Sequence, residues 1–157
     1  MNEEHKDSPR INKFIHPPII ALFWIIIAYL LGRYIPLTHT SSIIQTLGLG
    51  LVIIALILGF SAFNEFRKLQ TTLDPHGSVK ALATNGIYKL SRNPIYLGFL
   101  LMVIGFPFYS GYYSGIIIAP LFLISMNRLV IEKEEAYLEK KFGDVYTGYK
   151  SNVRRWF

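Results

Sequence analysis

The chain contains no cysteine, and long stretches of it carry no charged residue. The lack of cysteine excludes a disulfide scaffold, a cysteine-ligated metal site and a cysteine nucleophile. Charged residues make up only 17% of the 157 residues, and no Asp, Glu, Lys or Arg lies within 14–32, 34–64 or 93–127. A soluble core of this size cannot bury three such blocks. We therefore predict a single integral membrane domain covering residues 1–157.

The charge-free blocks are long enough to cross a bilayer. A hydrocarbon core of roughly 30 Å needs about 20 apolar residues per helix. The third block is too long for one span, and Pro107 and the glycine-containing turn at 111–115 divide it. The sequence thus predicts an all-α, polytopic fold with four transmembrane helices, over 18–35, 42–63, 94–108 and 113–130. No small-residue cleavage site follows the first span, so we expect it to stay as an anchor.

The positive charges predict the orientation. Lys and Arg near the ends of spans favour the cytoplasmic side. Of the 16 Lys and Arg residues, all except Arg33 lie in the N-terminal tail, in the loop at 64–93 or after residue 127. We expect both termini and any active site on the cytosolic side of a cell inner membrane or an endomembrane, and no nucleic-acid partner.

The loop at 64–93 ends in a pattern that starts a helix. It contains the turn signals Asp74-Pro75, His76-Gly77 and Asn85-Gly86, and it leads into Ser-Arg-Asn-Pro-Ile-Tyr at 91–96. Pro94 suits the first position of a helix and Asn93 suits its N-cap. A helix N-terminus would then lie beside Arg92 at the membrane face, which predicts a place for an anion.

The segment after the fourth span carries a second set of polar residues. We expect it to continue as a helix over 128–142 that ends at Gly143. α-Helical spacing predicts that one charged stripe runs along this helix, formed by Arg128, Glu132, Glu135 and Glu139. Glu134 lies beside this stripe. A short interfacial helix is then predicted from Asp144, able to close over the site, with one face formed by Tyr146, Tyr149 and Val153.

Each of these features also has an ordinary explanation. Arg92 fits a snorkelling positive-inside residue, and the charged stripe fits a solvated helix face with internal ion pairs. The aromatic residues fit an interfacial belt: Tyr88, Tyr96, Tyr146 and Trp156. No pair of histidines has metal-ligand spacing, so no metal site is predicted.

Taken together, residues 82–157 resemble the membrane-embedded methyltransferases. That superfamily includes isoprenylcysteine carboxyl methyltransferase and the phospholipid N-methyltransferases. Arg92, Pro94 and Tyr96 match its Arg-His-Pro-x-Tyr element, with Asn93 in place of the histidine. The family's acidic doublet and upstream arginine fall on Glu134, Glu135 and Arg128. Its tail pattern falls on Tyr146, Tyr149, Val153 and Arg155.

The resemblance implies S-adenosylmethionine as cofactor, held by a half of the chain covering about 71–157. It implies membrane lipids and a lipophilic or lipid-linked acceptor as partners: a prenylated cysteine carboxylate, a phospholipid amine or a small lipophilic molecule. The cofactor-binding residues expected from it are Leu82, Gly86, Tyr88, Arg92, Asn93, Tyr96 and Glu135. The catalytic residues expected from it are Arg128, Glu134 and Glu135.

The residue types suit these roles. Arg92 with the helix N-terminus can hold the cofactor's carboxylate, and a glutamate can face its ammonium group. Glu134 or Glu135 is also the nearest base for an amine or thiol acceptor, and Arg128 can orient a carboxylate or phosphate.

Two other functions stay open at this point. The first is a membrane-embedded NAD(P)H-dependent reductase of the sterol reductase type, whose chains are longer and have more spans. The second is a noncatalytic four-helix membrane subunit. Binding of S-adenosylmethionine, of NADPH or of neither distinguishes the three.

Overall fold

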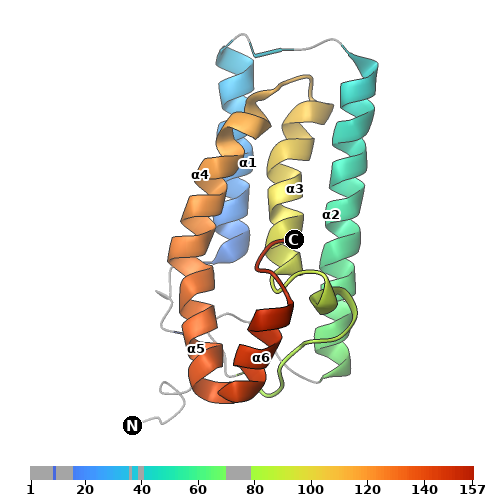
Figure 1. Cartoon of the computed structure of the whole chain (residues 1–157). Helices are drawn as coiled ribbons and strands as arrows, with labels where there is room; N and C mark the ends of the chain where they lie inside the picture. Colours follow the sequence, from blue (N-terminus) through green and yellow to red (C-terminus); the bar gives the residue numbers. More distant parts are fainter. Residues whose placement is uncertain (1–8, 10–15, 36, 39–40, 70–78) are drawn as a thin grey trace.

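The structure, a computed structural model of the chain, is a helical bundle (Figure 1). It describes residues 9, 16–35, 37–38, 41–69 and 79–157, so the predicted turns at 74–77 and the first part of the 71–157 half lie outside the described residues. The α-helices are α1 (Pro17–Tyr34), α2 (Ser42–Lys68), α3 (Pro94–Tyr109), α4 (Ser114–Met126), α5 (Glu132–Phe142) and α6 (Asp144–Asn152). A 3₁₀-helix η2 (Gly86–Lys89) precedes α3, and a π-helix η3 (Asn127–Ile131) joins α4 to α5.

The helix bounds agree closely with the sequence predictions. α3 begins at Pro94, whose fixed φ favours the first turn. α5 ends at Gly143, which has a φ of 52°, and α6 begins at Asp144. α2 is longer than predicted and runs to Lys68. The all-helical fold is therefore confirmed for the described part of the chain.

Three of the helical segments are long and apolar enough to cross a membrane. They are α1, α2 and the continuous segment formed by α4, η3 and α5. In the last of these residues 114–127 carry no charged side chain, and Arg128 is the first charged residue of the segment. α3 has 16 residues, which gives about 24 Å of helix against a hydrocarbon core of roughly 30 Å. The predicted count of four spans is thus supported for three.

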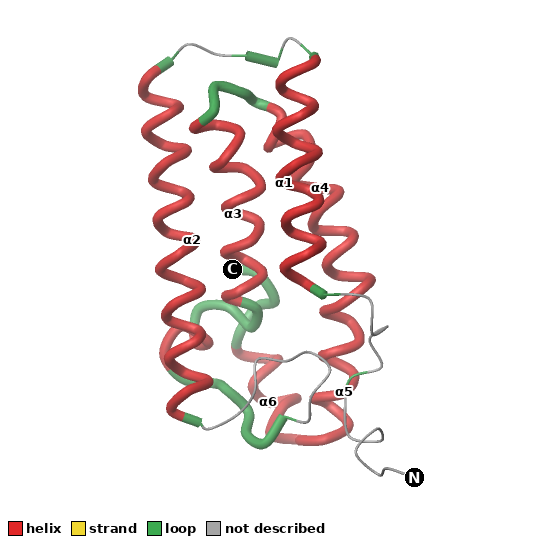
Figure 2. Tube along the Cα trace, turned by 180° about the vertical axis from the view of Figure 1, so that it is seen from behind, coloured by secondary structure: helices red, strands yellow, loops and turns green. Residues whose placement is uncertain are grey.

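α3 is the central helix, because it packs against α1, α2 and α4 (Figure 2). Its contact with α2 depends on glycine. A Cβ atom added at Gly105 would lie 2.8 Å from the carbonyl oxygen of Gly48, and one added at Gly98 would lie 3.0 Å from that of Ala55. These distances leave no room for a side chain, so the two helices approach backbone to backbone.

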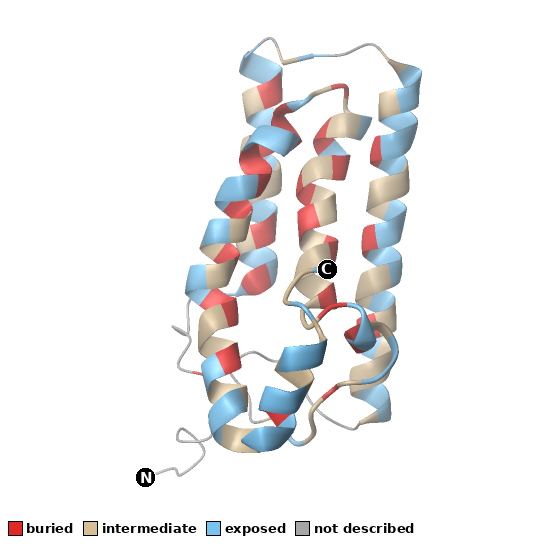
Figure 3. Ribbon diagram, in the orientation of Figure 1, coloured by how far each residue is buried: buried red, intermediate tan, exposed pale blue. Residues whose placement is uncertain are grey.

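The outward faces of α1 and α2 carry exposed apolar side chains (Figure 3). Leu22, Leu56 and Phe60 are each more than half exposed. A soluble protein rarely exposes a continuous apolar surface of this extent. Together with the apolar helices, this surface supports a membrane protein.

Candidate active site

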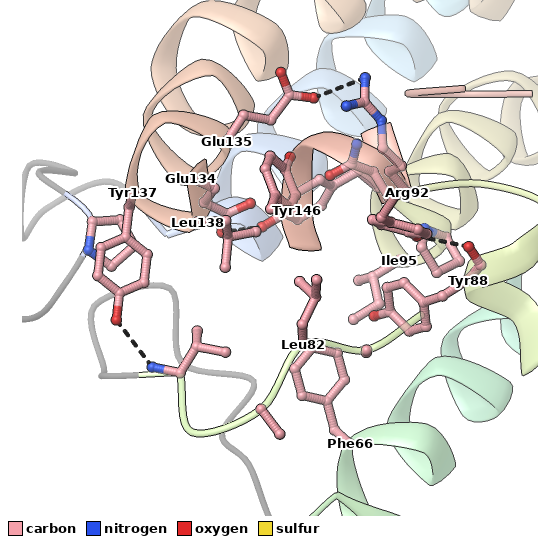
Figure 4. A pocket seen from close by; sticks show the side chains of 18 residues that line it. Phe66, Leu82, Tyr88, Arg92, Ile95, Glu134, Glu135, Tyr137, Leu138 and Tyr146 are labelled. Carbon is pink, nitrogen blue, oxygen red and sulfur yellow. Dashed lines mark hydrogen bonds and ion pairs between the residues drawn. The ribbon is translucent and has the colours of Figure 1, made fainter. Parts of the chain in front are cut away.

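A cavity lies where α6 and the C-terminal tail cross the end of the bundle (Figure 4). Its walls come from the end of α2, the segment 79–96, α5 and α6. Seven of the predicted site residues line it: Leu82, Tyr88, Arg92, Asn93, Tyr96, Glu134 and Glu135. Residues that are distant in the sequence are therefore brought to one place.

The Arg-Asn-Pro-x-Tyr corner contacts both glutamates of the acidic doublet. The Nη2 of Arg92 lies 3.2 Å from the Oε1 of Glu135. The hydroxyl of Tyr96 donates a hydrogen bond of 2.7 Å to Glu134. The prediction that these two motifs form one site is confirmed by the geometry.

Arg92 has donors that no described residue satisfies. Its side chain is only 10% exposed, and its Nε and Nη1 atoms are buried without a hydrogen-bond partner in the described part of the chain. A buried charged donor without a partner is costly, by about 1–3 kcal/mol or more. Because Arg92 lines the cavity, an anion bound there would satisfy both atoms.

Glu135 is held by a second arginine. Arg155 donates from Nε to Oε1 at 3.0 Å and from Nη2 to Oε2 at 2.7 Å, and these bonds raise the pKa of Arg155. Glu135 is therefore paired with two guanidinium groups, those of Arg92 and Arg155. Arg155 was not predicted as a site residue, although it matched the family's tail pattern, which was the available signal.

The C-terminal tail is hydrogen-bonded to the segment before α3. The backbone N–H of Arg92 donates to the carbonyl oxygen of Arg154 at 3.0 Å. Ser91 Oγ and Asn93 Nδ2 both donate to the carbonyl oxygen of Arg155, at 3.2 and 3.0 Å. Asn93 occupies the N-cap position as predicted, and its side chain makes this bond and no capping hydrogen bond.

Glu134 lies on α5 and lines the cavity, after the apolar part of the segment formed by α4, η3 and α5. Burial raises the pKa of Glu134 to about 7, and the neighbouring carboxylate of Glu135 also raises this pKa. The hydrogen bond from Tyr96 lowers it, because that bond stabilises the ionised form. Glu134 can thus gain or lose a proton near neutral pH, as a general base must.

Aromatic and apolar side chains form the rest of the wall. Phe66 packs edge-on against Tyr88, with ring centroids 5.7 Å apart. Tyr149 donates a 2.6 Å hydrogen bond to the carbonyl oxygen of Tyr88. Burial, and then the charge of Glu135, raises the pKa of Tyr146 to about 12, while the charge of Arg92 and a hydrogen bond with it lower this pKa, so the hydroxyl of Tyr146 stays protonated at neutral pH and faces the Arg92 guanidinium. The short helix predicted from Asp144 is present as α6, and it contributes Tyr146 and Tyr149 to the cavity wall.

Gly86, a predicted cofactor-binding residue, does not line the cavity. It has a φ of 58°, and a Cβ atom added there would lie 2.7 Å from Oε1 of Glu65. Glycine therefore fits a positive-φ turn packed against α2.

Arg128, a predicted catalytic residue, also lies outside the cavity. Its side chain is 74% exposed and pairs with Glu132 at 3.4 Å, whereas the side chain of Glu135 is only 9% exposed. Arg128 and Glu132, two members of the predicted stripe, thus pair at the surface, and Arg128 does not contribute to the cavity wall. The helix predicted over 128–142 is a π-helix up to Ile131 and an α-helix from Glu132.

Comparisons with known proteins identify the family of this chain. Residues 43–145 match the family described as phospholipid methyltransferase. The chain is 30% identical over 114 residues to a protein-S-isoprenylcysteine O-methyltransferase of Schizosaccharomyces pombe, covering 71% of this chain and 48% of that protein. It thus spans about half the length of that relative.

A second relative is an uncharacterized protein of Haemophilus influenzae, 39% identical over 62 residues, which are 40% of this chain and 98% of that protein. No solved structure matches the chain. The family match covers well over half of the sequence and includes the Arg92 corner and both glutamates. The chain therefore belongs to the phospholipid methyltransferase family of membrane methyltransferases.

Proposed function

We propose that the chain transfers a methyl group from S-adenosylmethionine to a lipophilic acceptor, with the reaction taking place in the cavity between α5, α6 and the start of α3. The observation that carries this proposal is the Arg92 guanidinium. It lines the cavity with two buried donors that lack a hydrogen-bond partner in the described part of the chain, which suits an anionic group of a ligand.

The cavity residues fit the charged and apolar parts of the cofactor. Arg92 would hold its carboxylate and Glu134 would face its ammonium group. Tyr88 and Leu82 offer an aromatic and apolar surface for the adenine. When bound, the cofactor supplies a methyl group already activated by its sulfonium. The protein's own work is to position the acceptor and exclude water.

Glu134 is the proposed proton acceptor. An amine or thiol acceptor loses a proton during methylation, and a carboxyl group with a pKa of about 7 can take it at neutral pH. The hydroxyl of Tyr96 holds this carboxylate in place. A carboxylate acceptor needs no proton removed, so a dependence on Glu134 would distinguish the two classes of acceptor.

An apolar groove between α2 and α3 supports a lipophilic acceptor. Ala55, Gly59 and Phe63 line its α2 side and Gly98 its α3 side. Ile95 lines both this groove and the cavity. An acceptor with an acyl or isoprenyl chain would lie with the chain in the groove and its reactive group in the cavity.

The proposed orientation follows from the charges around the cavity. We propose that α3 completes a four-span topology as a short fourth span and that the cavity opens to the cytosol. The cavity end of the bundle carries most of the Lys and Arg residues, which supports this placement.

The test is calorimetry with S-adenosylmethionine on the protein in nanodiscs. The wild type should bind, and Arg92→Ala should weaken binding by about 10- to 100-fold, since hydrogen bonds to charged groups contribute roughly 1.5–3 kcal/mol. Lys89→Ala is the matched control, because it removes the same charge from an exposed position on the same segment. Binding of NADPH alone would favour a reductase, and binding of neither would favour a noncatalytic subunit.

The acceptor is then identified by incubating the protein with a membrane lipid extract and radiolabelled cofactor. The labelled product should be lipid-soluble. A labelled product that is water-soluble, or no product with a protein that binds the cofactor, would contradict the proposed acceptor class.

A further inference from the structure

Arg155 contacts the site without lining the cavity. Its guanidinium takes both oxygens of Glu135, at 3.0 and 2.7 Å, and only Oε1 is shared with Arg92. We infer that Arg155 is a positioning residue for the anion site, keeping the Arg92 guanidinium available to a ligand carboxylate by occupying Glu135. This inference rests on the proposed function, because the carboxylate is that of S-adenosylmethionine.

The geometry shows what Arg155 prevents. A carboxylate and a guanidinium normally form two parallel hydrogen bonds. Here Glu135 makes that paired contact with Arg155, so Arg92 reaches it through Nη2 alone. The Nε and Nη1 atoms of Arg92 have no hydrogen-bond partner among the residues that the structure describes. Without Arg155, Glu135 would be free to make the paired contact with Arg92 and would compete with the ligand.

The charges lead to the same conclusion. Arg92, Arg155 and Glu135 together carry one formal positive charge, since two guanidinium groups face one carboxylate, and this charge balances Glu134 when Glu134 is ionised. If Arg155 lost its charge, Arg92 and Glu135 would form a neutral pair. The positive charge next to the Arg92 guanidinium attracts a ligand carboxylate, and the loss of Arg155 would remove that local positive charge and leave Glu134 unbalanced.

A substitution at Arg155 can separate this role from the structural one. The tail is tied to the segment before α3 through the backbone carbonyl of Arg155, which accepts from Ser91 and Asn93. A changed side chain leaves that carbonyl in place. Arg155→Gln keeps a hydrogen-bond donor toward Glu135 and removes the charge, and Arg155→Lys keeps the charge.

The experiment measures the affinity of each protein in nanodiscs for S-adenosylmethionine and for its decarboxylated form, which lacks only the carboxylate. Arg155→Gln should weaken binding of S-adenosylmethionine by about tenfold or more and change binding of the decarboxylated form less than twofold. Arg155→Lys should recover most of the difference. Arg154→Ala, which removes the same charge from an exposed neighbour, should leave the ratio of the two affinities as in the wild type.

An equal loss for both ligands in Arg155→Gln would show a merely structural role and overturn the inference. A wild-type ratio in that variant would overturn it as well. If Arg155→Gln does not fold, Arg155→Lys decides through the ratio of its affinity for S-adenosylmethionine to its affinity for the decarboxylated form. A ratio as low as that of Arg92→Ala would overturn the inference, and a ratio near that of the wild type would support it. If the wild type binds neither ligand, the proposed function fails and the inference fails with it.

Discussion

Replacing Tyr96 with phenylalanine should raise the pKa of Glu134, so that Glu134 loses its proton at a higher pH. The Tyr96 hydroxyl donates a 2.7 Å hydrogen bond to Glu134 and thereby stabilises the ionised carboxylate, whose pKa is about 7. A hydrogen bond to a charged group is worth roughly 1.5–3 kcal/mol, and one pKa unit corresponds to about 1.4 kcal/mol. Losing this bond should therefore raise the pKa of Glu134 by about 1–2 units.

The assay is the affinity for S-adenosylmethionine measured by calorimetry between about pH 5.5 and 9. In the wild type, binding should tighten as the pH rises through about 7, because the ionised Glu134 attracts the ligand's ammonium group. In Tyr96→Phe the same rise should occur at a higher pH. The ligand's own titration is the same for both proteins and cancels in the comparison.

Tyr149→Phe is the matched control for this prediction. It removes one hydroxyl from the same cavity, but that hydroxyl bonds to the backbone of Tyr88 and not to Glu134. Its pH midpoint should equal that of the wild type. The reasoning is refuted if the midpoint of Tyr96→Phe stays in place or falls, or if both phenylalanine variants shift equally.

Two further predictions concern packing and the exposed arginine. Gly105→Val should lower the thermal unfolding temperature in detergent and the yield of monodisperse protein, because its Cβ would lie 2.8 Å from a backbone carbonyl oxygen of α2. Gly50→Val is the control and should change neither, because no described atom lies within 4 Å of its Cβ. Equal behaviour of the two variants would contradict the close contact. Arg128→Ala should leave the affinity for S-adenosylmethionine within about twofold of the wild type, because the Arg128 side chain is 74% exposed and its ion pair with Glu132 contributes little. A tenfold loss of affinity by calorimetry would place Arg128 in the site.

The helices were predictable because their signals are local. The charge-free blocks predict the apolar helices, Pro94 marks the first residue of α3, and Gly143 lies between α5 and α6. Each signal acts through a residue's own backbone preference or through its transfer into the membrane, so neighbouring residues suffice to read it. The span count is less certain from sequence, because the length of α3 falls near the limit for crossing a bilayer.

The site was predictable only in part. The family pattern predicted that the motif around Arg92 and the two glutamates lie close together, and the structure confirms these contacts. The pairing of Glu135 with Arg155 could not be derived, since it depends on how the tail folds back over the bundle. Long-range contacts of this kind leave no periodic signal in the sequence.

The π-helix between α4 and α5 has a consequence for comparing relatives. The π-turn takes up one more residue than an α-helical turn, so the α-helical spacing of side chains after it is offset by about 100° in sequence from the spacing before it. The lipid-facing pattern of α4 and the inward direction of Glu135 therefore follow two different registers of the sequence, and η3 lies between them. A relative with one residue fewer between Met126 and Glu132, and a regular α-helix in place of η3, would still direct its acidic pair toward the arginines. The number of residues between the apolar helix and the acidic pair can thus differ by one between homologues while the site keeps its geometry.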